Sequence, residues 1–160
     1  MTTDGFTTCL WFDGQAEDAA HYYVSIFKNS RIGRIGRYTE AGPGPAGSVL
    51  AVEFVANGQK FVALNGGPEF TFDEAISFQI FCEDQEEVDH YWNKLTEGGG
   101  EGGPCGWLKD KYGLSWQVVP AKLIDMVSDS DAEKATRTTR AMLQMSKLDI
   151  AVLEKAYAGE

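Results

Sequence analysis

Few residues of this chain have a chemically reactive side chain at a position suited to catalysis, and Glu53 is the first of them. Strand alternation places its carboxylate on the side of a strand that mixes polar and aromatic residues. Held away from water, a carboxylate becomes a stronger base and suits proton abstraction from a substrate, so Glu53 is the candidate catalytic residue. The alternative, which we favour, is an ion pair with Arg31, Arg34 or Arg37.

The histidines and cysteines are weaker candidates for catalysis or metal binding. His21 and His90 fall outside the apolar stripes of two expected helices, so we expect both to be solvated, which removes the usual general base and metal ligand. Cys9 and Cys82 are expected among apolar residues that face helices. Cys105 lies in a Pro-Cys-Gly turn and could be exposed and reactive, although a structural role is favoured. Three widely spaced cysteines predict no disulfide framework and a cytoplasmic location.

An internal repeat organises the chain. The segment Thr8–Tyr23 (TCLWFDGQAEDAAHYY) aligns with Ser77–Trp92 (SFQIFCEDQEEVDHYW), 69 positions later. Each copy predicts a short strand, an acidic turn and a helix, because acidic residues suit the first turn of a helix. Strand-like stretches follow each helix, and Asn57-Gly58 between two of them predicts a hairpin. The glycine-rich run 98–103 is expected to be a loop.

The predicted fold is therefore α+β. Two pseudo-repeated βαβββ modules, about residues 5–68 and 74–120, form a domain over residues 1–120 with a curved mixed-sheet cleft. Residues 121–160 have helical spacing of apolar residues, with a break and an N-cap at Asp129 to Asp131. We expect this C-terminal extension to pack on the domain or on a second subunit.

Alternation along the strands predicts which side chains face the cleft. In the first strand of each module, Thr8, Leu10 and Phe12 and their counterparts Ser77, Gln79 and Phe81 are expected there, whereas Cys9 and Trp11 are expected to face a helix. In the last strand, Gln117 is expected in the cleft with Ser115 and Val119. The candidate ligand-binding residues are Thr8, Phe12, Ser77, Gln79, Phe81 and Gln117; the alternative for each is ordinary strand packing.

Composition excludes several partners. The net charge of −10 repels nucleic acid backbones, and the basic segment 31–38 (RIGRIGRY) is more typical of a solvated edge than of an anion site. No apolar run is long enough to span a membrane, and no secretory signal is visible. We expect neither nucleic acid nor membrane as a partner.

The motifs together resemble the vicinal oxygen chelate superfamily, which includes glyoxalases, bleomycin resistance proteins and dioxygenases, and within it the PhnB-like branch labelled 3-demethylubiquinone-9 3-methyltransferase. The stretches that carry the resemblance are DGQAEDAAHYYVSIF, FVALNGGP and KDKYGLSWQVVP. The resemblance implies two modules whose sheets enclose a cup-shaped cleft, and a homodimer.

Catalytic members of this superfamily hold one divalent metal with His and Glu side chains from the first and last strand of each module. The matching positions here are Thr8, Val62 or Ala63, Ser77 and Gln117, none of which is a histidine or carboxylate. We therefore expect no metal and no other cofactor. The sequence also lacks the strand, glycine-rich turn and helix that commonly hold a nucleoside-bearing methyl donor, so methyl transfer is not expected.

Three hypotheses for the function remain. The leading one is a PhnB-like protein that binds a small, partly apolar molecule in its cleft without a catalytic metal. The second is an enzyme of the superfamily, a lyase, transferase or antibiotic-resistance enzyme, that uses Glu53 or a metal. The third is a dimeric interaction module that docks through its C-terminal helices.

Overall fold

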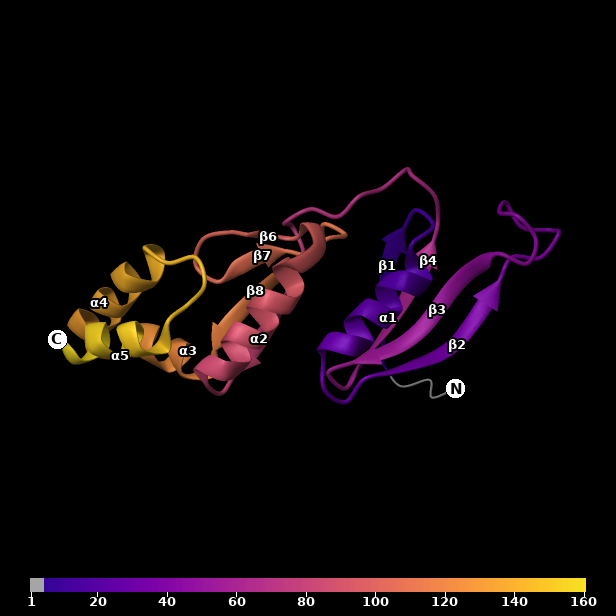
Figure 1. Ribbon diagram of the computed structural model, residues 1–160. Helices are drawn as coiled ribbons and strands as arrows, with labels where there is room; N and C mark the ends of the chain where they lie inside the picture. The colour runs from indigo at the N-terminus through magenta and orange to yellow at the C-terminus, as the bar shows by residue number, and fades with distance from the viewer. Residues whose placement is uncertain (1–4) are drawn as a thin grey trace. The chain divides into compact units, whose positions relative to one another are not determined.

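The computed structural model describes residues 5–160, which Figure 1 shows as a ribbon. The chain forms two compact units, divided between Thr71 and Phe72, and the three C-terminal helices belong to the second unit. No helix of the described residues is long and apolar enough to cross a membrane.

The first unit is a βαβββ module with a helix on one face of its sheet (Figure 1). Its sheet has the order β1-β4-β3-β2, in which β1 is parallel to β4 and the other pairs are antiparallel. The elements are β1 (Thr8–Phe12), α1 (Ala16–Ile26), β2 (Arg31–Arg37), β3 (Val49–Ala56) and β4 (Gln59–Asn65).

The second unit repeats this module and extends it. Its sheet has the order β5-β8-β7-β6, again with one parallel pair, β5 and β8. The elements of the module are β5 (Ser77–Cys82), α2 (Gln85–Thr96), the 3-10 turn η1 (Glu97–Gly99), β6 (Glu101–Gly102), β7 (Trp107–Lys109) and β8 (Ser115–Pro120). The predicted α+β class with two βαβββ modules is confirmed, although the glycine-rich run expected to be a loop contains the short strand β6.

Each helix packs on one face of its sheet through residues spaced three and four apart. In α1 these include Ala16, Ala20 and Tyr23, and the Tyr23 ring stacks on Phe54 of β3 with ring centroids 6.0 Å apart. In α2 they are Val88, Tyr91 and Leu95. We call the other face of each sheet its open face.

The predicted hairpin is present. Asn57 and Gly58 connect β3 to β4, and both have positive φ, 51° and 76°. A two-residue turn of this kind matches the twist of the paired strands and requires residues that tolerate the left-handed region. Asn and Gly are such residues, so the local sequence accounts for this connection.

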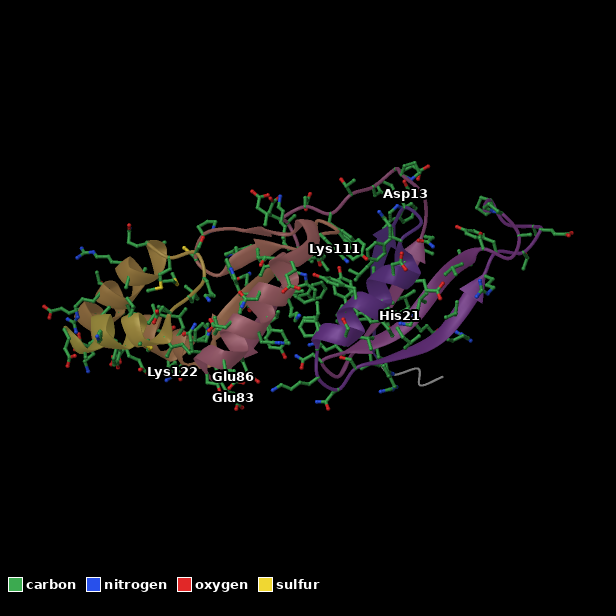
Figure 2. The ribbon with its side chains drawn as sticks, viewed as in Figure 1. Asp13, His21, Glu83, Glu86, Lys111 and Lys122 are labelled. Carbon is green, nitrogen blue, oxygen red and sulfur yellow. The ribbon has the colours of Figure 1, made fainter. Side chains whose placement is uncertain are left out.

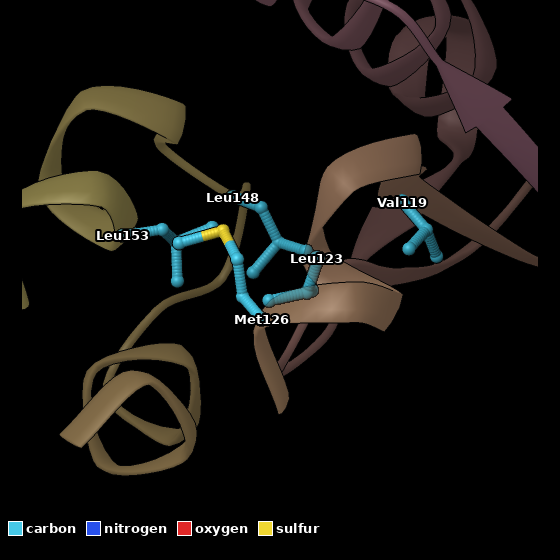
Figure 3. Close-up of a cluster of buried hydrophobic side chains, with 5 residues drawn as sticks. All are labelled: Val119, Leu123, Met126, Leu148 and Leu153. Carbon is cyan, nitrogen blue, oxygen red and sulfur yellow. The ribbon is translucent and has the colours of Figure 1, made fainter. Parts of the chain in front are cut away.

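The C-terminal segment folds as three helices, α3 (Ala121–Val127), α4 (Ala132–Leu143) and α5 (Ile150–Ala158). The break predicted at Asp129 to Asp131 is confirmed, because the Asp131 carboxylate caps the first backbone N–H groups of α4. A buried apolar cluster joins these helices to β8 (Figure 3); its members are Val119, Leu123, Met126, Leu148 and Leu153.

The faces expected for β1 are wrong. Thr8 lies opposite Phe61, and Leu10 opposite Ala63, on the face that α1 covers. Phe12 is only 3% exposed, whereas Phe81, its counterpart in the sequence repeat, is 53% exposed. Thr8 and Phe12 therefore do not line an open face, and Cys9, expected beneath a helix, is exposed instead.

The length of one turn explains this reversal. Three residues, Asp13, Gly14 and Gln15, separate β1 from α1, but only Glu83 and Asp84 separate β5 from α2. An alignment that matches the helices thus shifts the strands by one residue, and a shift of one residue moves every side chain to the opposite face. Gly14 has a φ of 89°, a conformation that glycine adopts without strain.

Candidate functional site

The open face of the second sheet carries most of the polar candidates. Gln79 pairs in register with Gln117, and Ser77 with Ser115. The opposite parity belongs to Ile80 and other residues buried beneath α2, so the Ser77, Gln79, Phe81 and Gln117 side chains lie on the open face.

A row of neutral hydrogen bonds crosses this face. The Gln79 amide nitrogen donates to the Gln117 side-chain oxygen at 3.3 Å, and the Gln117 nitrogen donates to Ser77 Oγ at 2.9 Å. The Gln79 oxygen and the Ser77 hydroxyl proton remain available to a ligand. We call these three residues the amide row.

The β7–β8 hairpin that carries Gln117 is held by one buried carboxylate. Asp110 Oδ1 accepts hydrogen bonds from the backbone N–H groups of Tyr112 and Leu114, and Oδ2 accepts from the Trp116 indole at 2.9 Å. Hydrogen bonds to a buried charge are strong, so Asp110 fixes the register of β8 and thus the placement of Gln117. This arrangement accounts for the KDKYGLSW motif.

Ser115 differs from its neighbours on this face. Its side chain is 1% exposed, and its Oγ has no hydrogen-bond partner among residues 5–160. Buried hydroxyls are almost always hydrogen-bonded, because an unmade bond costs free energy. Ser115 also lines a hollow on the open face, which makes its hydroxyl the most unusual polar group of the second unit.

The hollow, which we call the Ser115 pocket, has a volume of about 400 Å³. Its apolar walls come from Trp107, Leu108 and Pro104, with backbone from Gly102 and Gly103. Trp107 pairs in register with Gln117, so the pocket continues the surface that the amide row begins. The sequence predicted Ser115 on the cleft side, but Ser115 was not among the candidate ligand-binding residues.

Three charged residues complete the lining of the Ser115 pocket: Glu74, Glu101 and Lys109. Lys109 forms an ion pair with Glu74, and both side chains remain substantially exposed. The hydrogen bond from Lys109 lowers the pKa of Glu74, and the same bond raises the pKa of Lys109, so both stay charged at neutral pH. The pocket therefore has one paired cation and an excess of negative charge.

The open face of the first sheet has a different row. Cys9 of β1 pairs with Val62 of β4, which pairs with Glu53 of β3. Glu53 accepts a hydrogen bond from Arg34 at 2.6 Å, and its side chain is 45% exposed. This is the ion pair favoured from the sequence, and the burial that a catalytic role would need is absent.

Cys9 is the residue of this row that sequence reasoning missed. It is an exposed cysteine, yet the surrounding sheet shields its thiol enough to raise its pKa, so the thiol is protonated at neutral pH. The feature that would have placed Cys9 on the open face is the longer turn before α1, which the alignment of the sequence repeat conceals.

The histidines and the remaining cysteine do not extend either site. His21 is an exposed residue of α1 (Figure 2), and His90 is an exposed residue of α2, as predicted. Cys105 is half-buried with a φ of 56°, and its N–H donates to the Met145 carbonyl at 2.8 Å. That hydrogen bond gives Cys105 a structural role in a turn.

The donor set does not suit the divalent metal that the family resemblance implies. In the second sheet, the first and last strands offer only the hydroxyl and amides of the amide row. In the first sheet, Val62 separates Cys9 from Glu53. Among the described residues, no three His, Cys, Asp or Glu side chains gather as a metal site would require.

Comparison with known proteins identifies a family and a related solved structure. A profile of the family described as 3-demethylubiquinone-9 3-methyltransferase matches residues 4–119. The PhnB protein of Bacillus cereus is 39% identical; the match covers 74% of this chain and all of that one, with a TM-score of 0.65. No curated protein matches this sequence.

Two further solved structures share the fold at low identity. Protein PA1353 from Pseudomonas aeruginosa is 17% identical over 69% of this chain and 92% of its own, with a TM-score of 0.53. The fosfomycin resistance protein FosX from Mesorhizobium loti is 12% identical over 72% of this chain and 90% of its own, with a TM-score of 0.50. These likenesses concern the fold alone. The helices α3 to α5 lie beyond the residues that the family profile matches.

Proposed function

Since the chain belongs to the PhnB-like 3-demethylubiquinone-9 3-methyltransferase family, of the two-module vicinal oxygen chelate fold, we propose that it binds a small, partly apolar molecule on the open face of its second sheet. The observation that carries this proposal is the amide row of Ser77, Gln79 and Gln117. In the proposed complex, the row orients the ligand and no divalent metal takes part.

The chemistry of the row supports binding by neutral hydrogen bonds. Each amide has a donor and an acceptor in fixed positions, and Gln117 uses both ends of its amide to hold its two neighbours. A ligand carbonyl or hydroxyl can bond to Ser77 or Gln79 without a change in their mutual bonds. Phe81, more than half exposed beside the row, supplies apolar contact. Small-molecule sites commonly combine apolar walls with a few such polar groups.

Metal-dependent chemistry and methyl transfer are not part of the proposal. Neutral amides and hydroxyls are weak ligands, which do not hold a catalytic divalent ion by themselves. The family description names a methyl transfer. Within residues 5–160, however, each sheet has a single parallel strand pair, and no glycine-rich turn lies between a strand and the following helix.

Ligand screening by thermal shift tests the binding proposal, because a ligand that binds only the folded protein raises its apparent stability. We expect hits that stabilise the wild-type protein and lose this effect in Gln117→Leu. The matched control is Gln144→Leu, at an exposed position of the C-terminal segment. Hits that stabilise both variants as they do the wild type would contradict a role for the amide row.

Metal content tests the second part of the proposal. We expect less than about a tenth of an equivalent of zinc, nickel or manganese after dialysis against each ion, measured by mass spectrometry. A stoichiometric metal that Gln117→Leu removes would overturn the metal-free proposal. We also propose the homodimer that the family resemblance implies, which mass measurement in solution tests.

A further inference from the structure

We propose that the Ser115 pocket binds a small aromatic compound, neutral or positively charged, whose hydroxyl group forms a hydrogen bond with Ser115 Oγ. The inference rests on the proposed function and adds the class of ligand to it. Three features of the pocket carry it: the Ser115 hydroxyl, which has no partner among the described residues, the apolar walls and the sign of the charges at the rim.

The Ser115 hydroxyl is the first feature. Its register partner Ser77 accepts a hydrogen bond from Gln117, whereas Ser115 Oγ has no partner within the described chain. The free energy of leaving this group without a bond is a cost that the free protein already bears. A ligand hydroxyl that completes the bond removes that cost, so the group favours binding more than an ordinary surface serine would.

The walls select the shape of the ligand. Trp107, Pro104 and Leu108 supply apolar surface, and Gly102 and Gly103 complete the lining. Aromatic rings favour stacked or edge contacts with an indole. A volume of about 400 Å³ holds a single substituted ring with space to spare.

The rim selects the charge. Glu101 lies opposite Lys109 in register, and Lys109 is already paired with Glu74. The rim thus contains two carboxylates and one cation. Because Glu74 compensates the charge of Lys109, the charge of Glu101 remains in excess. An anionic ligand meets net repulsion here, whereas an amine is attracted.

The same ion pair controls access to Ser115. Lys109 is the register partner of Ser115, so the Lys109 side chain lies beside the buried hydroxyl. Exposed ion pairs contribute little to stability, so a ligand can displace the Lys109 and Glu74 side chains at small cost.

Three phenols of similar size but different charge test the inference: tyramine, the uncharged 4-propylphenol and the carboxylate 3-(4-hydroxyphenyl)propionate. Each is titrated into the full chain and followed by NMR. We expect tyramine and 4-propylphenol to shift the Trp107 indole and Ser115 amide signals. Coulomb repulsion at the rim should make the carboxylate bind at least about five-fold more weakly.

Two variants test the contributions of the Ser115 hydroxyl and of the Glu101 charge to binding. Ser115→Ala should weaken the binding of 4-propylphenol about three- to ten-fold through loss of one hydrogen bond, whereas Ser130→Ala, at an exposed position, should leave it unchanged. Glu101→Gln should reduce the preference for tyramine over the carboxylate. Glu101→Gln tests the predicted charge preference even if Ser115→Ala does not fold.

Several results would overturn the inference: equal binding by wild type and Ser115→Ala, preference for the carboxylate, or no binding of any of the three phenols. Failure of this inference can be distinguished from failure of the proposed function. If Gln117→Leu abolishes binding of 4-propylphenol while Ser115→Ala does not, the amide row binds the ligand and the Ser115 pocket does not. The reverse pattern supports the pocket and contradicts the role of the row.

Discussion

Replacement of Ser115 by alanine should stabilise the free protein, which is the opposite of what most core substitutions do. A buried hydroxyl without a partner costs roughly 1–3 kcal/mol. Its removal from Ser115 forfeits some packing, and alanine is a poorer strand residue than serine by a fraction of the ~1 kcal/mol span of strand propensities. The expected net change is a gain of about 1 kcal/mol in the free energy of unfolding.

The control for this prediction lies directly beside it. Ser77 is the register partner of Ser115 on the same face, but its Oγ accepts the Gln117 hydrogen bond at 2.9 Å. Ser77→Ala should therefore destabilise the protein by roughly 0.5–1.5 kcal/mol. The same chemical change at two paired positions thus has opposite expected signs.

Urea denaturation followed by tryptophan fluorescence measures both changes. Trp11 is the one tryptophan in the first unit, so a Trp11→Phe background restricts the signal to the second unit. The m-value should stay constant between variants, which shows that the change lies in stability. If Ser115→Ala destabilises the second unit as much as Ser77→Ala does, the argument from the partnerless hydroxyl is refuted.

Three further predictions concern the framework of the second unit. Asp110→Ala should cost about 3 kcal/mol of unfolding free energy in urea, because it leaves three donors without their charged acceptor; a loss below about 1 kcal/mol would contradict its role in the hairpin. Leu148→Ala should cost roughly 2–5 kcal/mol in the same assay, because Leu148 is buried where the helices meet β8; an unchanged midpoint would show that the cluster is loosely packed. Tyr157 donates a hydrogen bond to the Asp129 carboxylate, and this bond lowers the pKa of Asp129. The interaction therefore stabilises the fold at pH values above the unfolded pKa of Asp129. Its contribution is lost as the pH falls through the lower pKa of the folded state. Tyr157→Phe should accordingly lower the melting temperature at pH 7. The variant should converge with the wild type in acid, once the pH is below the lowered folded pKa of Asp129; a difference that persists there would indicate packing instead.

Local sequence was sufficient for the modules and several turns. The helical stripes, the Asn57-Gly58 turn and the N-cap at Asp131 each depend on residues within a few positions of one another. Such features follow from backbone preferences and periodicity, which act over short stretches of chain.

The faces of β1 could not be obtained in the same way. The sequence repeat matches the helices, and it conceals the one-residue difference between the turns before α1 and α2. Nonlocal contacts fix the longer turn, because Asn65 of β4 accepts the hydrogen bond from the Ala16 N–H at the start of α1 at 2.9 Å. Asp84 performs this task locally for α2, where it accepts from the Glu87 N–H. A cap supplied by a distant strand leaves no signal near the turn that it stabilises.

The Ser115 pocket was beyond sequence reasoning for a related cause: part of its wall is positioned by the C-terminal segment. Ser146 Oγ donates to the Gly103 carbonyl, and the Gly106 N–H donates to the Ser146 carbonyl, both at 2.8 Å. Gly103 lines the pocket, yet Ser146 lies beyond the residues that the family profile matches. The amide row belongs to the module that the family shares, whereas the width of the neighbouring pocket depends on added helices. Relatives with the same module but another C-terminal segment should therefore keep a row of this kind and differ in the ring that they accept beside it.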